Sequence, residues 1–445
     1  MTAEPRPSKA PLRIGLIGTF DVANYGDCLF PVVYEALVGR TRSDCKFTYY
    51  SPLARDVSIR DYGPVKSLPE TLNDIHFDED VLILCGGETL DLGHSSGTFN
   101  FPSSTLGANA RLWLAPTVAA SRGDVAFYVH CVGMPPADGA PRPEIAEALK
   151  SATRVSLRDA VSAQRLGDIF PVETDPVFAL SDLKTDGEWQ EEAARWLPEG
   201  YATDGYLAAH VSAPYLEPGA LGRWCGEVAS IARQQNLPIL LVPVCHFMDD
   251  RLTLTAARKL LLELGFDESR VVLAPDGSEN IIATAAILGK SAGVVTSSLH
   301  ATVTAVSFGK PFATLVGTGR SNSKHRQTLL TVGIDYGMAL EIENLVAVYA
   351  HALEQDGNRA RKKAVELAKR DFAPVLQLLE APERRTRPIP PKALERVLER
   401  DRKGTQDFRF EAKRRVLRMM NRFKPTAKLL TMRRQRRLTA RWQDA

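Results

Sequence analysis

One histidine stands where an apolar run gives way to a helical pattern, a position from which a side chain can reach a ligand. The stretch GVVTSSLHATVTAVSFGKP places His300 directly after Ser297 and Ser298. The first turn of a helix presents unpaired N–H groups and the positive end of the helix dipole, and both favour an anion. We therefore predict an anion site at these three residues. A helix cap or a buried core histidine is the alternative interpretation of His300.

Further cations follow on the next loop. The segment GTGRSNSKHR comes after another apolar run and carries Arg320, Lys324 and His325. Arginine and lysine bind phosphates and carboxylates through charge-assisted hydrogen bonds, so cations gathered on neighbouring loops favour a small, highly charged anion such as a phosphate ester. We assign these three residues to the predicted anion site.

A glycine-containing loop near the N-terminus offers an amide and a carboxylate. In GTFDVANYGDCLF, Asn24, Gly26 and Asp27 lie between an apolar run and a helical pattern that we expect to begin at about Asp27. Gly26 lets the backbone approach a ligand closely. Asp27 either caps the helix or serves a ligand as a base. The loop is not a GxGxxG fingerprint, so it does not predict a dinucleotide site.

A second glycine-containing loop, CGGETLDLGHSSG, carries two carboxylates. Gly86 and Gly87 permit a tight turn, and Glu88 and Asp91 can hold the hydroxyl groups of a sugar. A plain turn is the alternative interpretation of this loop.

Short apolar runs alternate with amphipathic stretches and so predict the elements that position these residues. The expected strands begin at Arg13, Val81, Val125, Arg154, Tyr206, Leu237, Arg270, Gly293 and Pro311. This βαβ alternation predicts parallel sheets, and an acidic segment reaching about Asp204 interrupts it. We therefore predict an α/β protein with two Rossmann-like domains, residues 12–183 and 202–371. Ligands of such sheets bind at the carboxyl ends of the strands, where the residues above fall.

The composition of the 445-residue chain fits two such domains and an extension, with 44% hydrophobic residues. We expect neither a membrane span nor a signal peptide, because the chain has no run of 18 apolar residues and no apolar stretch near its start. The expected compartment is the cytoplasm. The six cysteines are scattered without metal-ligand spacing, so we expect reduced core thiols and no metal site.

The C-terminal residues 384–445 form a basic, partly helical tail. Between Arg384 and Arg437 there are 20 Lys and Arg against 5 Asp and Glu, a net charge of +15, whereas the remainder carries −12. Phe408, Val416 and Phe423 stand among these arginines with partly helical spacing, which predicts a basic amphipathic helix that lies on an anionic membrane surface. Packing of these apolar residues on the second domain, or a solvated tail, are the alternatives.

The order of these motifs resembles the polysaccharide pyruvyl transferases. The resemblance spans about residues 12–333 and rests on ANYGD, CGGETLD, VSLRDAVSAQRLG, TDPVFAL, VTSSLHATVTAVSFGKP and SKHRQTLLTVG. It implies a glycosyltransferase-B-like architecture and transfer of pyruvate from phosphoenolpyruvate onto a sugar as a ketal. It further implies that Arg158 and His300 contact phosphoenolpyruvate and that Lys324 falls near a late family lysine. Ser298 stands where many members have arginine, and Glu88 stands where a third glycine is common.

The resemblance and the residues together give one set of expected roles. His300 would protonate the methylene carbon of phosphoenolpyruvate, and Asp27 or Glu88 would deprotonate the acceptor. The expected sets are catalytic His300, Asp27 and Glu88; donor-binding Arg158, Ser297, Ser298, Lys324, His325 and Arg320; and acceptor-binding Asn24, Gly26, Gly86, Gly87 and Asp91.

The expected partners are phosphoenolpyruvate and a saccharide acceptor of a cell-surface polysaccharide or glycolipid, lipid-linked if the basic tail docks at the inner membrane face. No cofactor and no metal are expected. The alternatives are a glycosyltransferase that uses a nucleotide-sugar, and a non-catalytic relative that binds an anion.

Overall fold

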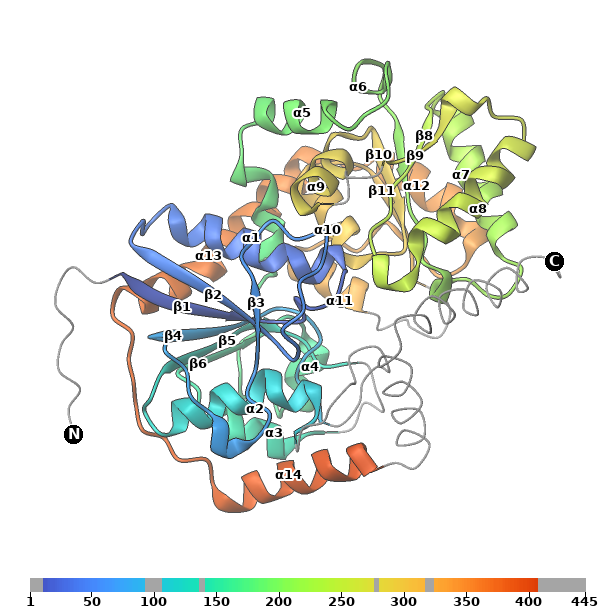
Figure 1. Cartoon of the computed structure of the whole chain (residues 1–445). Coiled ribbons are helices and arrows are strands. Elements are labelled where there is room, and N and C mark those ends of the chain that lie inside the picture. The colour runs from blue at the N-terminus through green and yellow to red at the C-terminus, as the bar shows by residue number, and fades with distance from the viewer. Residues whose placement is uncertain (1–10, 93–105, 136–140, 276–279, 317–323, 407–445) are drawn as a thin grey trace.

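The computed structural model has two parallel β-sheets, one in each of two domains (Figure 1). The structure describes residues 11–92, 106–135, 141–275, 280–316 and 324–406. Each sheet has six strands, all pairs are parallel, and helices cover both faces. This is the predicted α/β architecture of two Rossmann-like domains.

The first sheet has the strand order β3-β2-β1-β4-β5-β6. Its strands are β1 Leu12–Ile17, β2 Cys45–Ser51, β3 Val65–Ser67, β4 Val81–Cys85, β5 Ala126–Val132 and β6 Arg154–Leu157. Its helices are α1 Tyr25–Gly39, α2 Ala108–Ser121, α3 Pro143–Leu149 and α4 Ala160–Arg165. In β4, Val81, Ile83 and Cys85 pack toward one face of the sheet, and Leu82 and Leu84 pack toward the other. A strand covered on both faces is apolar at every position, which explains why VLILC predicts a buried strand.

The second sheet has the strand order β12-β11-β10-β7-β8-β9. Its strands are β7 Leu207–Ala209, β8 Ile239–Leu241, β9 Val271–Leu273, β10 Gly293–Thr296, β11 Phe312–Leu315 and β12 Met338–Ala339. Its helices are α7 Leu221–Gln234, α8 Asp250–Glu263, α9 Ile281–Lys290, α10 Leu299–Ser307, α11 Lys324–Thr331 and α12 Leu345–Leu353. The short turn η4, His246–Met248, precedes α8.

The chain passes between the sheets twice. After β6 it runs through the 3-10 segment η2 (Pro176–Leu183), α5 (Asp186–Ala194) and α6 (Tyr201–Asp204) into the second sheet. After α12 it returns along α13 (Gly357–Glu380), which packs against η2 and places Phe372 against the rings of Tyr34 and His130. The first domain is therefore completed by a helix that follows the second domain in the sequence.

The helix α14 (Pro391–Gln406) lies under α3 on the first domain, at the bottom of Figure 1. Ile389, Ala393 and Val397 are buried there in the core between the sheet, α2 and α3. Arg400 pairs with Glu144 at 2.8 Å. The start of the basic tail is thus part of the first domain, while the tail residues 407–445 lie outside the described residues. No helix in the described ranges is both long and apolar enough to cross a membrane.

Candidate active site

A cavity of about 410 Å³ lies between the two domains at the carboxyl ends of the strands. Both domains line it, as the parallel-sheet rule predicts. The predicted residues that line it are Asn24, Asp27, Gly87, Glu88, Arg158, Ser297, Ser298, His300 and Lys324.

The His300 imidazole is seated by residues of the opposite domain. His300 is the second residue of α10 and 8% exposed, and its ring meets the Phe30 ring edge-on with centroids 5.2 Å apart. A Cβ on Gly26 would lie 2.1 Å from His300 Nδ1, so this position has room for the imidazole only because it is glycine. The predicted close approach at Gly26 is real, but the approaching group is a side chain of the other domain.

Helix α10 is capped by Ser298, whose Oγ accepts from the Ala301 N–H at 3.4 Å. The cap interpretation of His300 is therefore wrong. Likewise α1 begins at Tyr25, two residues before the predicted start, and Asn24 is its cap. Asn24 Oδ1 accepts from the Gly26 N–H at 3.4 Å, so Asp27 is not the cap either.

Asp27 faces the cavity from the first turn of α1. Its carboxylate accepts from Asn24 Nδ2 at 2.8 Å. Burial raises its pKa, while the nearby His300, Asn24 and Lys324 oppose the rise without cancelling it. A carboxylate with a raised pKa beside a ligand cavity is a better base than an exposed one.

Glu88 joins two cations of the cavity. Its carboxylate lies 3.5 Å from Arg158 Nη2 and 3.6 Å from Lys324 Nζ. The charge of Glu88 raises the pKa of Lys324, which keeps the ammonium charged. The Arg158 side chain is only 2% exposed, and a Cβ on Gly133 would lie 2.8 Å from its Nη2. Glu88 therefore holds Arg158 of the first domain and Lys324 of the second domain beside each other at the cavity.

Asp175 is a site residue to which the sequence analysis gave no role. It precedes η2, has no exposed surface, and places Oδ2 3.7 Å from His300 Nε2. Burial by itself would raise its pKa, but the His300 imidazole and the Val177 N–H together lower the pKa below its ordinary value. A buried carboxylate beside an imidazole orients the ring and stabilises its charged form. The sequence feature that could have indicated this role is the acidic residue of the motif TDPVFAL, which is Asp175.

Three buried polar atoms at this site make no hydrogen bond within the described part of the chain. They are Arg158 Nε, which lies 3.8 Å from Asp159 Oδ2, and His300 Nε2 and Asp175 Oδ2, which form the 3.7 Å ion pair. Buried polar groups are normally hydrogen-bonded, and Arg158 and His300 line the cavity, so these two side chains indicate a ligand site. The hydroxyl oxygens of Ser297 and Ser298 each accept a backbone N–H, and their own protons can be donated.

Gly86, His325 and Asp91 are not among the residues that line the cavity. Gly86 has φ +51°, and a Cβ there would meet the Phe30 ring at 2.2 Å, so Gly86 supports the ring that packs on His300. His325 is buried beside the Tyr215 ring, and burial lowers its pKa well below the ordinary value. Asp91 is buried outside the lining, and Arg320 lies outside the described residues.

One group of side chains has the spacing of metal ligands. His130, Cys131 and Glu173 place their ligand atoms within 4.8 Å of one another in the first domain. Each of the three also contacts another protein group. His130 is hydrogen-bonded to the Tyr34 hydroxyl, the Cys131 thiol donates to the Thr174 carbonyl, and Glu173 forms an ion pair with Arg154.

A sequence comparison decides the family. Residues 24–317, about two thirds of the chain, match the family described as polysaccharide pyruvyl transferase. The chain belongs to the polysaccharide pyruvyl transferase family. This transferase therefore has the family that its motifs predict, although the match is shorter than the predicted resemblance and ends before Lys324. No curated protein matches the sequence.

Solved structures share the fold of this pyruvyl transferase family member. The UDP-GlcNAc 2-epimerase from Methanocaldococcus jannaschii is 13% identical, with 82% of this chain and 99% of that chain covered and a TM-score of 0.52. A putative UDP-N-acetylglucosamine 2-epimerase from Listeria monocytogenes (12%, 84% and 99%, 0.47) and a glycosyltransferase from Rickettsia africae (8%, 84% and 100%, 0.46) also match. The similarity to the Methanocaldococcus jannaschii epimerase shows that this chain has the predicted glycosyltransferase-B-like fold.

Proposed function

We propose that this family member transfers a pyruvyl group from phosphoenolpyruvate to two hydroxyls of a sugar, forming a ketal on a cell-surface polysaccharide or glycolipid. The observation that carries the proposal is that Arg158 and His300 are buried and line one cavity, where Arg158 Nε and His300 Nε2 make no hydrogen bond to any described residue. Phosphoenolpyruvate brings a carboxylate and a phosphate on three carbons and needs several fixed donors at short range.

The donor side of the site supplies these groups in two ways. Arg158 and Lys324 contribute charge, and Ser297 and Ser298 contribute hydroxyl protons at the N-terminus of α10. The hydroxyl of Ser298 takes the place of the arginine that many members carry there. A helix N-terminus favours an anion, which supports the proposal at a position that has lost a cation.

The reaction follows from the positions of His300 and Asp27. His300 donates a proton to the methylene carbon, and the first sugar hydroxyl adds to C2 while Asp27 takes its proton. The bond from C2 to the phosphate oxygen then breaks, and the leaving phosphate takes the proton from Asp27. The second hydroxyl adds to C2 and closes the ketal, and its proton returns to His300. Asp175 stabilises the charged imidazole. Glu88 holds two cations, so Asp27 is the better base of the two predicted.

No cofactor enters this proposal, because the donor substrate itself carries the group that is transferred. In this proposal the acceptor binds at the first-domain side of the cavity, which Asn24, Asp27 and Gly87 line. Asparagine and aspartate side chains can bind sugar hydroxyls from that wall.

The experiment is calorimetric binding of phosphoenolpyruvate to the full chain, with a panel of nucleotide-sugars as competitors. We expect binding of phosphoenolpyruvate alone. Arg158→Lys should weaken it by about tenfold or more, because a lysine keeps the charge but loses the planar, multi-donor grip. Binding of a nucleotide-sugar instead would favour the glycosyltransferase. Binding of phosphoenolpyruvate without product formation from a sugar diol would favour a non-catalytic relative.

For the basic tail we propose attachment to an anionic membrane surface near lipid-linked acceptors. The support is the positive charge of residues 407–445 and the apolar residues among the arginines. Co-sedimentation with phosphatidylglycerol vesicles and with phosphatidylcholine vesicles tests it. We expect binding to the anionic vesicles only, and loss of binding when the chain ends at Gln406. Equal binding to both vesicles, or binding without the tail, would contradict attachment through it.

A further inference from the structure

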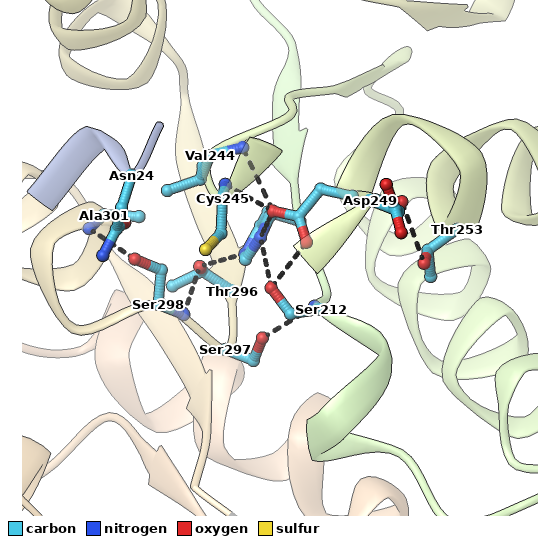
Figure 2. A network of polar contacts seen from close by, with 12 residues as sticks. Asn24, Ser212, Val244, Cys245, Asp249, Thr253, Thr296, Ser297, Ser298 and Ala301 are labelled. Atoms are coloured by element: carbon cyan, nitrogen blue, oxygen red, sulfur yellow. Dashed lines mark hydrogen bonds and ion pairs between the residues drawn. The ribbon is translucent and has the colours of Figure 1, made fainter. Parts of the chain in front are cut away.

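A buried carboxylate behind the cavity gathers several hydrogen-bond donors. Asp250, at the start of α8, has no exposed surface. It accepts from Ser212 Oγ at 2.6 Å, His210 Nε2 at 2.7 Å, the Cys245 N–H at 2.6 Å and the Val244 N–H at 3.3 Å. Ser212, Val244 and Cys245 lie close to one another in Figure 2, each at the end of a dashed line. We call these five residues the Asp250 clamp.

The clamp reaches the donor side of the cavity through two further bonds. His210 Nδ1 lies 2.9 Å from Thr296 Oγ1, and the same hydroxyl oxygen accepts the Ser298 N–H at 2.9 Å. The Ser212 N–H donates to Ser297 Oγ at 3.0 Å. Figure 2 shows Thr296, Ser297 and Ser298 beside the clamp. The clamp therefore sets the backbone position of one serine and the hydroxyl of the other.

The clamp also reaches the acceptor side. The Val244 carbonyl accepts from the Tyr25 N–H at 3.0 Å, and Cys245 forms an antiparallel bridge with Asn24. Asn24 in turn donates to the Asp27 carboxylate. The segment that Asp250 holds through two N–H groups is thus the segment that joins the second domain to the start of α1.

We propose that Asp250 and His210 are positioning residues, which hold the donor-side serines and the Asn24–Asp27 loop in register across the cavity. Neither is among the residues that line the cavity, so neither touches a ligand there. Burial of a carboxylate is costly unless its bonds are satisfied, and a fully satisfied polar network specifies one geometry. The role rests on the proposed transfer reaction, but its structural part can be tested without any substrate.

The substrate-independent test uses the thiol of Cys245 as a reporter. Cys245 lines the cavity, is 7% exposed as a residue, and has its N–H held by Asp250. In Asp250→Asn one carboxylate oxygen becomes an NH2 group, which donates instead of accepting, and the negative charge that strengthens the bonds from these four donors is lost. Thr253→Val is the matched control, because Thr253 is buried one turn along α8 and its hydroxyl bonds only weakly, to the Asp249 carbonyl at 3.5 Å.

We expect iodoacetamide, followed by mass spectrometry, to label Cys245 about tenfold faster in Asp250→Asn than in the wild type or in Thr253→Val. Cys225, a fully buried residue of α7, serves as the internal reference and should stay unlabelled in all three. Equal Cys245 labelling in Asp250→Asn and Thr253→Val would overturn the clamp as the holder of this segment.

The kinetic test separates positioning from general stability. Misplaced groups lower the rate steeply, so kcat should fall about tenfold to a hundredfold in Asp250→Asn while KM for phosphoenolpyruvate changes by less than about threefold. His210→Gln keeps an N–H for Asp250 and should recover most of the kcat that His210→Ala loses. An unchanged kcat in Asp250→Asn would overturn the positioning role. If the wild type does not turn over phosphoenolpyruvate, the proposed function fails, and the Cys245 result still decides on the clamp.

Discussion

At the scale of single residues, the geometry of the site depends on the lack of a side chain at Gly26. Gly26 belongs to the first domain, yet it makes room for the His300 imidazole of the second. Phe30 packs on the same imidazole, and Gly86 makes room for Phe30. The motif glycines therefore shape the seat of one imidazole as well as the cavity wall.

Gly26→Ala should displace the imidazole with little effect on folding. The backbone of Gly26 is not in the left-handed region, so alanine is compatible with the helix, but its Cβ would meet His300 Nδ1 at 2.1 Å. We expect kcat to fall by about a hundredfold, because small misplacements of catalytic groups are that costly. Gly39→Ala at the end of the same helix is the control, since its Cβ would meet nothing within 4 Å. Similar kcat values for the two variants would contradict this account of Gly26.

His300→Asn tests whether the imidazole itself is needed. Asparagine is a good helix-terminal residue, and Ser298 keeps its capping bond, so the melting temperature should remain close to that of the wild type. Turnover of phosphoenolpyruvate should fall by about a hundredfold or more, the scale of a lost general acid. Pyruvyl transfer at the wild-type rate by this variant would show that another group protonates the donor.

At the scale of elements, the sequence predicted the strands with a clear apolar pattern and missed strands that are partly exposed or very short. The run VLILC is apolar at every position and was predicted, whereas the first four residues of β2, CKFTYYS, are partly buried or exposed and give no continuous apolar run. The strands β3 and β12 have only three and two residues and were missed, although β6 and β9, which also lie at sheet edges, were predicted. The helical spacing of the apolar residues in α13 indicates that this helix buries one face. The spacing does not indicate which of the two domains covers that face.

The site was predictable where residue type and loop position coincide, and not where contacts are distant in sequence. His300 and Glu88 stand at strand ends, so the parallel-sheet rule brought them together, whereas Arg158 was predicted only through the family resemblance. Asp250 begins a helix and resembles any acidic first-turn residue. Only the fold shows that it meets His210, 40 residues away.

Helix α11 carries a buried histidine that should make folding stability depend on pH. The His325 pKa in the folded chain lies well below its unfolded value near 6.5, because burial and neighbouring cations disfavour the charged ring. Its contribution is therefore fully present above pH 6.5 and is lost as the pH falls below 6.5, by up to about 1.4 kcal/mol per pH unit. As the pH falls from 7 to 5, the free energy of unfolding measured by chemical denaturation should decrease less steeply for His325→Gln than for the wild type. His76→Gln, at an exposed histidine, should follow the wild type; identical slopes for all three would contradict the prediction.

At the scale of the whole molecule, the extension after the second domain has two parts with different roles. Residues 384–406 pack on the first domain through Ile389, Ala393 and Val397, and Arg384 pairs with Asp80 at 2.9 Å. The charge pattern of the sequence did not separate this docked helix from the rest of the basic tail.

Two truncations should separate these roles. A chain that ends at Glu383 loses the buried contacts of α14, so its free energy of unfolding should fall by about 3 to 5 kcal/mol, the scale for exposing two or three apolar side chains. A chain that ends at Gln406 should unfold like the full chain in urea. Equal stability of the two truncated chains would show that α14 does not stabilise the first domain.

The return of α13 and α14 to the first domain has a consequence for synthesis on the ribosome. The strands β1 to β6 are complete after about 160 residues, but Phe372 and Val397, which cover two faces of that sheet, are made more than 200 residues later. Domains usually fold in the order of their synthesis. Here the core of the first domain is completed by residues made after the second domain, so we expect the first domain to finish folding only after the second has been translated.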